Sequence, residues 1–196
     1  TVATKAQALQ TEAAVLMTTH LPPNLPEQEN AEGLYRGASL IFEDDDTFHG
    51  FLQDNAQPFA DPITQEDITF LTRHTETLDL LRQAAVRPVC RFTRDYTRPS
   101  FDMLLPEVQF FRDAARILAA SARYRASIGE MPAALRDVSS IMKISMHASS
   151  EPILISGLVG LAIDGIAVGV LIDILPFVDA DDLALLKRND IHNFLS

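Results

Sequence analysis

Six arginines gather between residues 73 and 98, and the last four of them lie close to a cysteine and a tyrosine. Guanidinium groups bind carboxylate or phosphate with two parallel hydrogen bonds, so a cluster of them is suited to anion recognition. We therefore predict a site for an anion or another small molecule, which could be enzymatic. Its candidate residues are Arg87, Cys90, Arg91, Arg94, Tyr96 and Arg98.

The same arginines have a second interpretation, in which they pair with acidic residues inside the fold. Residues 27–67 carry eleven acidic residues against a single arginine, Arg36. Runs of charge usually line solvated faces, where opposite charges partly neutralise one another. On this interpretation the cluster holds two segments of the chain together and binds no ligand.

Cys90 is the only cysteine of the chain. It excludes an internal disulfide and a zinc site built mainly from thiolates. The neighbouring arginines would favour the thiolate form and make it reactive. A free cysteine is also among the most buried residue types, and the sequence favours this second interpretation.

Other chemical motifs are missing from the sequence. The five histidines are scattered, with no His-x-x-x-His or Glu-x-x-His spacing, and the acidic runs 44–46 and 179–182 do not have the spacing of a calcium loop. No glycine-rich nucleotide-binding motif and no serine nucleophile elbow occurs. We therefore predict no catalytic residue, no metal ion and no cofactor.

The composition is that of a soluble globular protein with one sizeable core. The chain has 196 residues, of which 47% are hydrophobic and 22% are charged. Its formal net charge of -11 argues against nucleic-acid binding, which requires a net basic face.

The elements that would position these residues are helices, and the clearest three lie in the second half of the chain. Pro106, Pro132 and Pro152 each precede an apolar pattern of helical period. Proline is tolerated in the first turn because the N–H that it lacks has no partner there. Gly129 lies between the first two helices, where a helix end can turn left-handed. This pattern predicts a helical hairpin with a third helix behind it.

The first half of the chain also follows helical periods. We expect a short helix over residues 4–19, then an amphipathic helix from Glu29 to about Phe42 with Leu34 and Ile41 on its inner face. The side chains Phe48, Phe51 and Leu52 indicate a short helical turn after it.

A longer helix is expected from Thr64 to about Val86, because Thr64 and Asp67 form a capping pattern at its start. Residues 89–103 show no period and are predicted to wrap the core as an irregular strap. A last helix is expected over residues 182–193.

These elements predict an all-α fold of about seven helices in a single domain spanning residues 1–196. Within it, residues 1–26 form an N-terminal helix and a proline-rich arm. Residues 27–105 hold the acidic helix, the next helix and the strap, and residues 106–196 hold the hairpin, the apolar helix and the last helix.

Residues 153–175 form the most apolar stretch, whose length would let a helix span a bilayer. Gly165 and Gly169 have the G-x-x-x-G spacing that allows close helix approach in lipid. Against a membrane span, Asp164 and Asp173 project to opposite sides, and no lysine or arginine flanks either end. We predict the buried central helix of a soluble bundle, with a membrane-inserting helix as the alternative.

Three residues of the predicted hairpin match a known repeat. Gly129 and Ala134 have the spacing of an inter-helix glycine and a second-helix alanine, and Ala122 falls on a small first-helix position. In these residues the segment 106–147 resembles a tetratricopeptide repeat. The resemblance implies two antiparallel helices that present a surface to a protein or a peptide.

Residues 29–35, 87–90 and 151–156 are similar to segments of uncharacterised bacterial helical proteins. Members of that group often follow an N-terminal membrane anchor, so the resemblance implies an exported or periplasmic protein tethered to the inner membrane. A cytoplasmic location is the alternative. Because the chain starts at Thr1 and not at methionine, we expect a signal or anchor upstream.

Taken together, the sequence predicts a non-catalytic helical scaffold, or a module that binds a protein or peptide, in the bacterial cell envelope. The alternative function is anion or small-molecule binding in an arginine-lined pocket around residues 87–98.

Overall fold

The computed structural model describes residues 26–55, 62–92, 106–150 and 154–178, together with scattered residues between 4 and 15. Within these residues every regular element longer than a single bridge is helical, which confirms the predicted all-α class. The elements are α2 (Glu32–Glu43), α3 (Phe48–Asp54), α4 (Gln65–Arg73), α5 (Thr75–Ala85), α6 (Pro106–Ser127), α7 (Met131–Ser149), α8 (Leu154–Ile174) and the 3₁₀ turn η2 (Leu175–Phe177).

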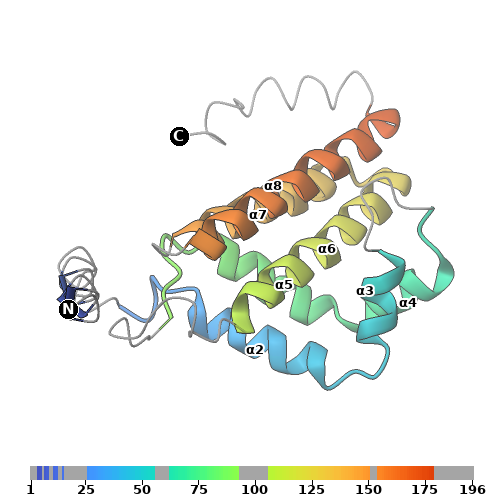
Figure 1. The fold of residues 1–196 in the computed structure, drawn as a ribbon. Helices are drawn as coiled ribbons and strands as arrows, with labels where there is room; N and C mark the ends of the chain where they lie inside the picture. The colour runs from blue at the N-terminus through green and yellow to red at the C-terminus, as the bar shows by residue number, and fades with distance from the viewer. Residues whose placement is uncertain are drawn as a thin grey trace.

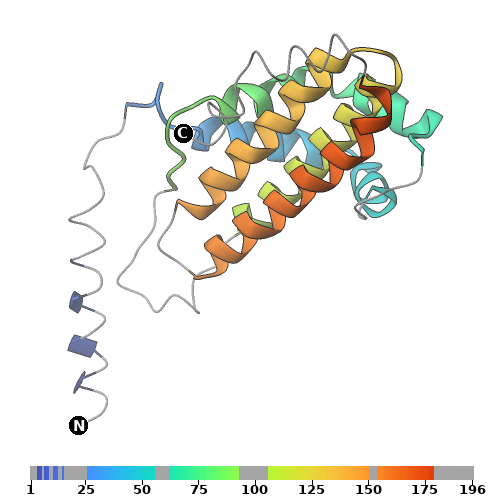
Figure 2. The ribbon, with the colours of Figure 1, turned by 90° about the horizontal axis from the view of Figure 1, so that it is seen from above.

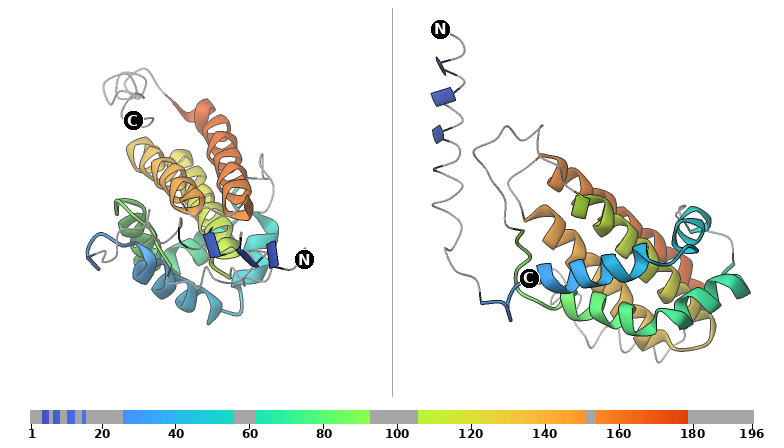
Figure 3. Two further views of the ribbon diagram at one scale, coloured as in Figure 1. Left: turned by 60° about the vertical axis from the view of Figure 1, so that its left-hand side comes forward. Right: turned by 90° about the horizontal axis from the view of Figure 1, so that it is seen from below.

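Helices α6, α7 and α8 lie side by side and alternate in direction, as Figures 1 and 2 show. Helices α2 and α5 pack against each other, and α5 joins this pair to α7 and α6. Helices α3 and α4 contact α6 near one end of the bundle. The end-on view in Figure 3 shows that α8 lies at the opposite edge of the bundle from α2 and α5.

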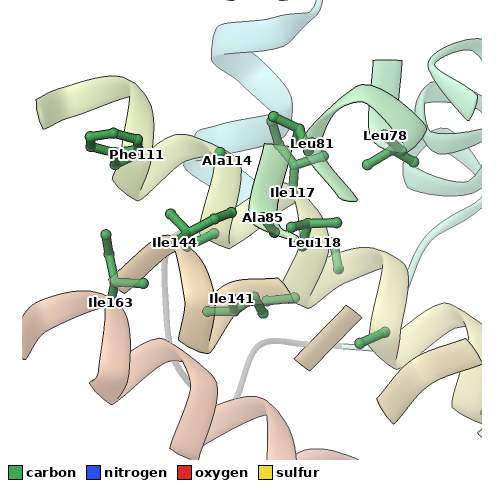
Figure 4. Packing of buried hydrophobic residues seen from close by; sticks show 14 of the residues in the cluster. Leu78, Leu81, Ala85, Phe111, Ala114, Ile117, Leu118, Ile141, Ile144 and Ile163 are labelled. Carbon is green, nitrogen blue, oxygen red and sulfur yellow. The ribbon is translucent and has the colours of Figure 1, made fainter. Parts of the chain in front are cut away.

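The core lies where α5, α6, α7 and α8 meet. Figure 4 shows Leu81 of α5, Ile117 of α6, Ile141 of α7 and Ile163 of α8 converging on one apolar interior. All four side chains have no exposed surface. Burying one such side chain contributes about 1.5–3 kcal/mol, so this junction supplies much of the stabilisation that holds the four helices together.

Helices α6 and α7 pack against each other and are joined by a short connection at Gly129. Gly129 has a φ of 81°, the left-handed conformation that ends many helices. The Glu130 amide donates to the Arg125 carbonyl at 2.8 Å, which satisfies one of the last carbonyls of α6. Because the connection is this short, α7 must return antiparallel along α6.

The prediction of one helix from Thr64 to Val86 is wrong, because the helix breaks at His74. The predicted capping box of Thr64 and Asp67 is present at its start. At the break, the buried His74 ring lies close to Phe42 and Phe70, and its Nε2 lies 2.8 Å from Asp45. Phe42 and Asp45 precede His74 by about 30 residues, so the local sequence does not predict the break.

Other expectations on the first half have mixed outcomes. The short helix at Phe48–Asp54 is confirmed, with Phe48, Phe51 and Leu52 buried. Ile41 was expected on the inner face of α2 but is 45% exposed, because Phe42 occupies the core position there. Several predictions fall outside the described residues. They concern most of the strap, the N-terminal proline-rich arm, Pro152 and the helix 182–193.

A buried carboxylate fixes the position of α5 relative to α6 and α7. Asp137 of α7 is fully buried, and its two oxygens bind Arg82 Nε of α5 at 2.6 Å and Ser121 Oγ of α6 at 2.7 Å. Arg125 Nε lies 3.5 Å from the same carboxylate. Arg82 also reaches Asp79, which is largely exposed, at 2.6 Å. One arginine therefore pairs with one buried and one exposed carboxylate.

The two carboxylates that pair with Arg82 allow a matched test of how burial affects the contribution of an ion pair to stability. We expect Asp137→Ala to lower the free energy of unfolding by about 3–5 kcal/mol, because it leaves Arg82 without its buried partner. Asp79→Ala removes a pair of the same length at the surface and should cost about 0–1 kcal/mol. Urea unfolding followed by circular dichroism measures both values, and equal losses would contradict the assignment.

Helix α8 approaches α7 closely at one glycine. Ser145 Oγ donates to the Gly160 carbonyl at 3.0 Å, so a side chain of α7 hydrogen-bonds the backbone of α8. A Cβ added at Gly160 would meet Ser149 Oγ and would lie 3.0 Å from the Ser145 carbonyl oxygen. An alanine at residue 160 would therefore require the Ser149 hydroxyl to turn away and the two helices to move apart by a few tenths of an ångström.

We expect Gly160→Ala to destabilise the protein by about 1–3 kcal/mol, because the helices must separate to admit the methyl group. Gly157→Ala, one turn earlier on the open side of α8, meets nothing within 4 Å. That variant should be neutral or stabilising by up to about 1 kcal/mol, because alanine favours a helix over glycine. Thermal unfolding of the two variants would refute this packing if both shifted in the same direction.

Candidate functional site

The described part of the predicted arginine site lies on the segment that follows α5. Asn30 clamps this segment: its Nδ2 donates to the Arg91 carbonyl at 2.9 Å and its Oδ1 accepts from the Arg91 amide at 2.9 Å. Asn30 and Val89 also form an isolated parallel bridge. Cys90 is buried, as the sequence analysis favoured, and its carbonyl accepts from Ser150 Oγ. Its thiol is therefore closed to solvent.

Arg87 lies beside an open hollow of about 990 Å³ at the start of α2. The walls of this hollow carry Glu27, Glu32 and Arg36 as well, and Arg36 Nε pairs with Glu32 at 2.9 Å. A hollow with two carboxylates is poorly suited to an anion. Arg94, Tyr96 and Arg98 lie outside the described residues, so the arginine site stays a prediction.

Two arginines that precede this segment follow the ion-pairing interpretation. Arg73 Nη1 contacts Asp45 at 2.8 Å, which joins the arginine-rich and acidic segments as the second interpretation expected. Arg82 pairs with Asp137 and Asp79, which belong to neither of the acidic runs. The arginine-rich segment is therefore paired partly with the acidic segment, through Arg73, and partly with carboxylates outside that segment, through Arg82.

A buried tyrosine–histidine pair ties this segment to the bundle. Tyr35 of α2 and His147 of α7 lie with Oη and Nδ1 2.9 Å apart, and His147 Nε2 lies 3.0 Å from the Arg87 carbonyl. A carbonyl can only accept, so Nε2 carries the hydrogen and Nδ1 accepts from the Tyr35 hydroxyl. The neutral imidazole thus joins α2, α7 and the segment after α5.

Burial lowers the pKa of His147, and the positive charge of Lys143 lowers it further, although the bond to the Arg87 carbonyl acts in the opposite direction. Burial also raises the pKa of Tyr35. Both residues are therefore held in their neutral forms, which is the state that their mutual hydrogen bond requires.

This arrangement predicts acid destabilisation. In the unfolded chain His147 takes up a proton near pH 6.5, whereas in the folded chain it does so at lower pH. The stabilisation is therefore complete above pH 6.5 and is lost as the pH falls towards the folded pKa. We expect the urea midpoint to fall between pH 7 and pH 5.5 in the native chain.

His147→Gln should remove most of that fall while lowering stability at pH 7. His49→Gln, at an exposed position of α3, should keep the fall unchanged. If the native chain and the His147→Gln variant lost stability in parallel, His147 would not be the group responsible.

Helix α8 is the most unusual surface feature of the described residues. It is the one described helix long and apolar enough to cross a membrane: an 18-residue window within Leu154–Phe177 has a mean hydropathy of 2.3, yet only a third of that window is buried. The prediction of a buried central helix is wrong in this respect. Since α8 packs mainly against α6 and α7, two neighbours cover one face and leave the other open.

The open face follows a regular spacing. Its central positions recur at alternating steps of four and three residues along the whole helix and into η2. This is the spacing of the a and d positions of a coiled coil, which form a seam that a second helix can cover. We call these positions the α8 stripe: Leu154, Leu158, Leu161, Gly165, Val168, Ile172 and Leu175.

The stripe is exposed in the described structure. Leu154 is 80% exposed and Leu161 is 69% exposed, and the other large side chains of the stripe range from 46% to 58%. A Cβ added at Gly165 would meet nothing within 4 Å. Single exposed leucines are common on soluble proteins, but an apolar row along a whole helix marks an interaction surface.

The two acidic residues of α8 stand beside the stripe. Asp173 is partly buried and lies 3.5 Å from Arg123 Nη1 of α6. Asp164 is exposed at the margin of the stripe. The stripe itself therefore contains no charge, and it can offer van der Waals contact and apolar burial but no anion recognition.

No group of three or more histidine, cysteine or acidic residues suited to a metal ion occurs among the described residues. Comparison of the chain with protein-family models, curated proteins and solved structures finds no match. The resemblances to the tetratricopeptide repeat and to uncharacterised bacterial helical proteins therefore stay predictions. The α8 stripe is the candidate functional site.

Sequence reasoning missed this site, although its signal is present. The steps of four and three residues can be read directly from residues 154–175. A helix buried on all sides would show the same apolar positions, so the pattern alone does not tell which face is open. That follows from the number of helices packed against α8, which is a property of the tertiary structure.

Proposed function

We propose that this protein is a non-catalytic helical module that binds a helix of a protein partner through the α8 stripe. The observation that carries the proposal is an uncharged, exposed row of seven positions at coiled-coil spacing. Covering one exposed leucine contributes about 1.5–3 kcal/mol, so a helix that covers the row gains enough to offset its loss of freedom on binding.

A protein helix suits the stripe better than a lipid surface does. Helices that lie on membranes carry lysine and arginine beside their apolar face, which attract anionic headgroups. Helix α8 carries neither residue, Asp164 borders its open face, and the chain has a net charge of -11. A membrane span would also have to remove the face of α8 that packs on α6 and α7.

Two finer parts of the proposal rest on the sequence resemblances. The hairpin of α6 and α7 would be a unit of the tetratricopeptide kind, supported by Gly129 in its left-handed conformation and by the buried Ala122 and Ala134. The proposed cell-envelope location, with a membrane anchor upstream of Thr1, rests on the resemblance of three segments to uncharacterised bacterial helical proteins, which often follow such an anchor.

The proposal predicts binding of a generic helix. The probe is a soluble, fluorescein-labelled designed peptide with leucine at each a and d position and alanine at the flanking e and g positions. We expect the native chain, diluted to a monomer, to raise the fluorescence anisotropy of this peptide. Leu161→Asp should weaken the binding about tenfold or more, because one apolar contact is replaced by a charge.

Leu40→Asp is a matched control, because Leu40 of α2 is 68% exposed and Leu161 is 69% exposed. It should leave the affinity for the peptide unchanged. Failure of the native monomer to bind the peptide would contradict the proposal. So would flotation of the native chain with phosphatidylcholine vesicles that is lost in Leu161→Asp, since the stripe would then bind lipid.

A further inference from the structure

The length of the α8 stripe restricts what can cover it. From Leu154 to Leu175 the stripe extends over about 31 Å at the helical rise of 1.5 Å per residue. A helix over residues 182–193, as the sequence predicts, would span only about 18 Å and is therefore shorter than the stripe. A partner that covers the whole stripe must therefore offer a helix of about the length of α8.

The positions that flank the stripe restrict the chemistry of that partner. Most coiled-coil helices carry charged residues beside the seam, which pair with charges on the other helix. In α8 these positions are small or apolar, apart from Asp164. A partner with charged flanks would bury its charges against groups that cannot pair with them. The exposed flanking positions are Ile155, Gly157, Ala162 and Asp164, whereas Gly169 is buried and Leu171 is half-buried.

Helix α8 of another copy meets both requirements. It has the same length, the same seam and the same nearly uncharged flanks. We infer that the partner is a second copy of this chain, with α8 packed in register and parallel against α8. This inference rests on the proposed function, because it names the partner of the same stripe.

The parallel orientation follows from Asp164. In a parallel pair packed in register, the two Asp164 carboxylates lie on opposite sides of the seam and do not meet. In an antiparallel pair whose stripes overlap fully, the two Asp164 carboxylates would face each other near the centre. Two like charges that face each other oppose association. The parallel pair instead places the two Gly165 residues opposite each other, where their backbones can approach closely.

Sedimentation velocity of the full chain over a range of concentrations tests the inference. We expect a reversible dimer of the native chain. Leu161→Asp changes both sides of the interface and should raise the dissociation constant about a hundredfold or more. Leu40→Asp, at the matched exposed leucine of α2, should leave it unchanged, and the helical circular dichroism of both variants should equal that of the native chain.

A cysteine at the centre of the stripe tests the orientation. Cys90 is buried and is the only native cysteine, so Gly165→Cys adds the one thiol of the described surface. In the parallel dimer the two introduced thiols lie opposite each other, and we expect mild oxidation to give a covalent dimer on a non-reducing gel. A dimer that depends on Leu161 but forms no disulfide at residue 165 would overturn the parallel packing.

The outcomes separate this inference from the proposed function. A native chain that stays monomeric at every concentration but binds the designed helix would overturn the second-copy inference and leave the proposed function standing. A dimer that survives Leu161→Asp would overturn the inference, because its interface would lie elsewhere. A monomer that also fails to bind the designed helix would overturn both.

Discussion

The Asp137 carboxylate, fully buried among α5, α6 and α7, is the constraint on which the rest of the arrangement depends. Removing a carboxylate from water costs several kcal/mol, and the cost is offset only where good hydrogen-bond partners remain in place. Arg82 and Ser121 supply these partners from two different helices. The three helices therefore keep one register along their axes. The position of α2 is then set by α5, on which it packs. The position of α8 is set by α6 and α7, on which it packs.

Local signals in the sequence were sufficient for the hairpin and for several helix ends. Gly129 and the capping box of Thr64 act within one turn of the chain, so their effect can be read without the tertiary structure. The break at His74 could not be read in this way. It depends on Asp45 and Phe42, which precede it by about 30 residues and reach it only after folding.

The candidate site likewise combines a feature that the local sequence predicts with one that depends on the tertiary structure. Apolar composition identified α8 as a helix, but it could not tell how many neighbours the helix has. Two packed helices cover one face of α8 and leave the stripe exposed. The charge pattern at 73–98 was informative in a different way: Arg73 and Arg82 proved to hold elements together. Arginines can bind ligands or join helices with the same atoms, and the sequence does not distinguish the two uses.

The contact between Tyr35 and His147 joins residues 112 positions apart. A ribosome adds about 5–20 residues per second, so α2 leaves the exit tunnel several seconds before the end of α7 has been made. During that interval Tyr35 lacks Phe111 of α6 and His147 of α7, the two aromatic side chains against which it finally packs. The nascent chain therefore passes through a stage in which Tyr35 of α2 is open to chaperones, and this stage ends only after α7 has been made.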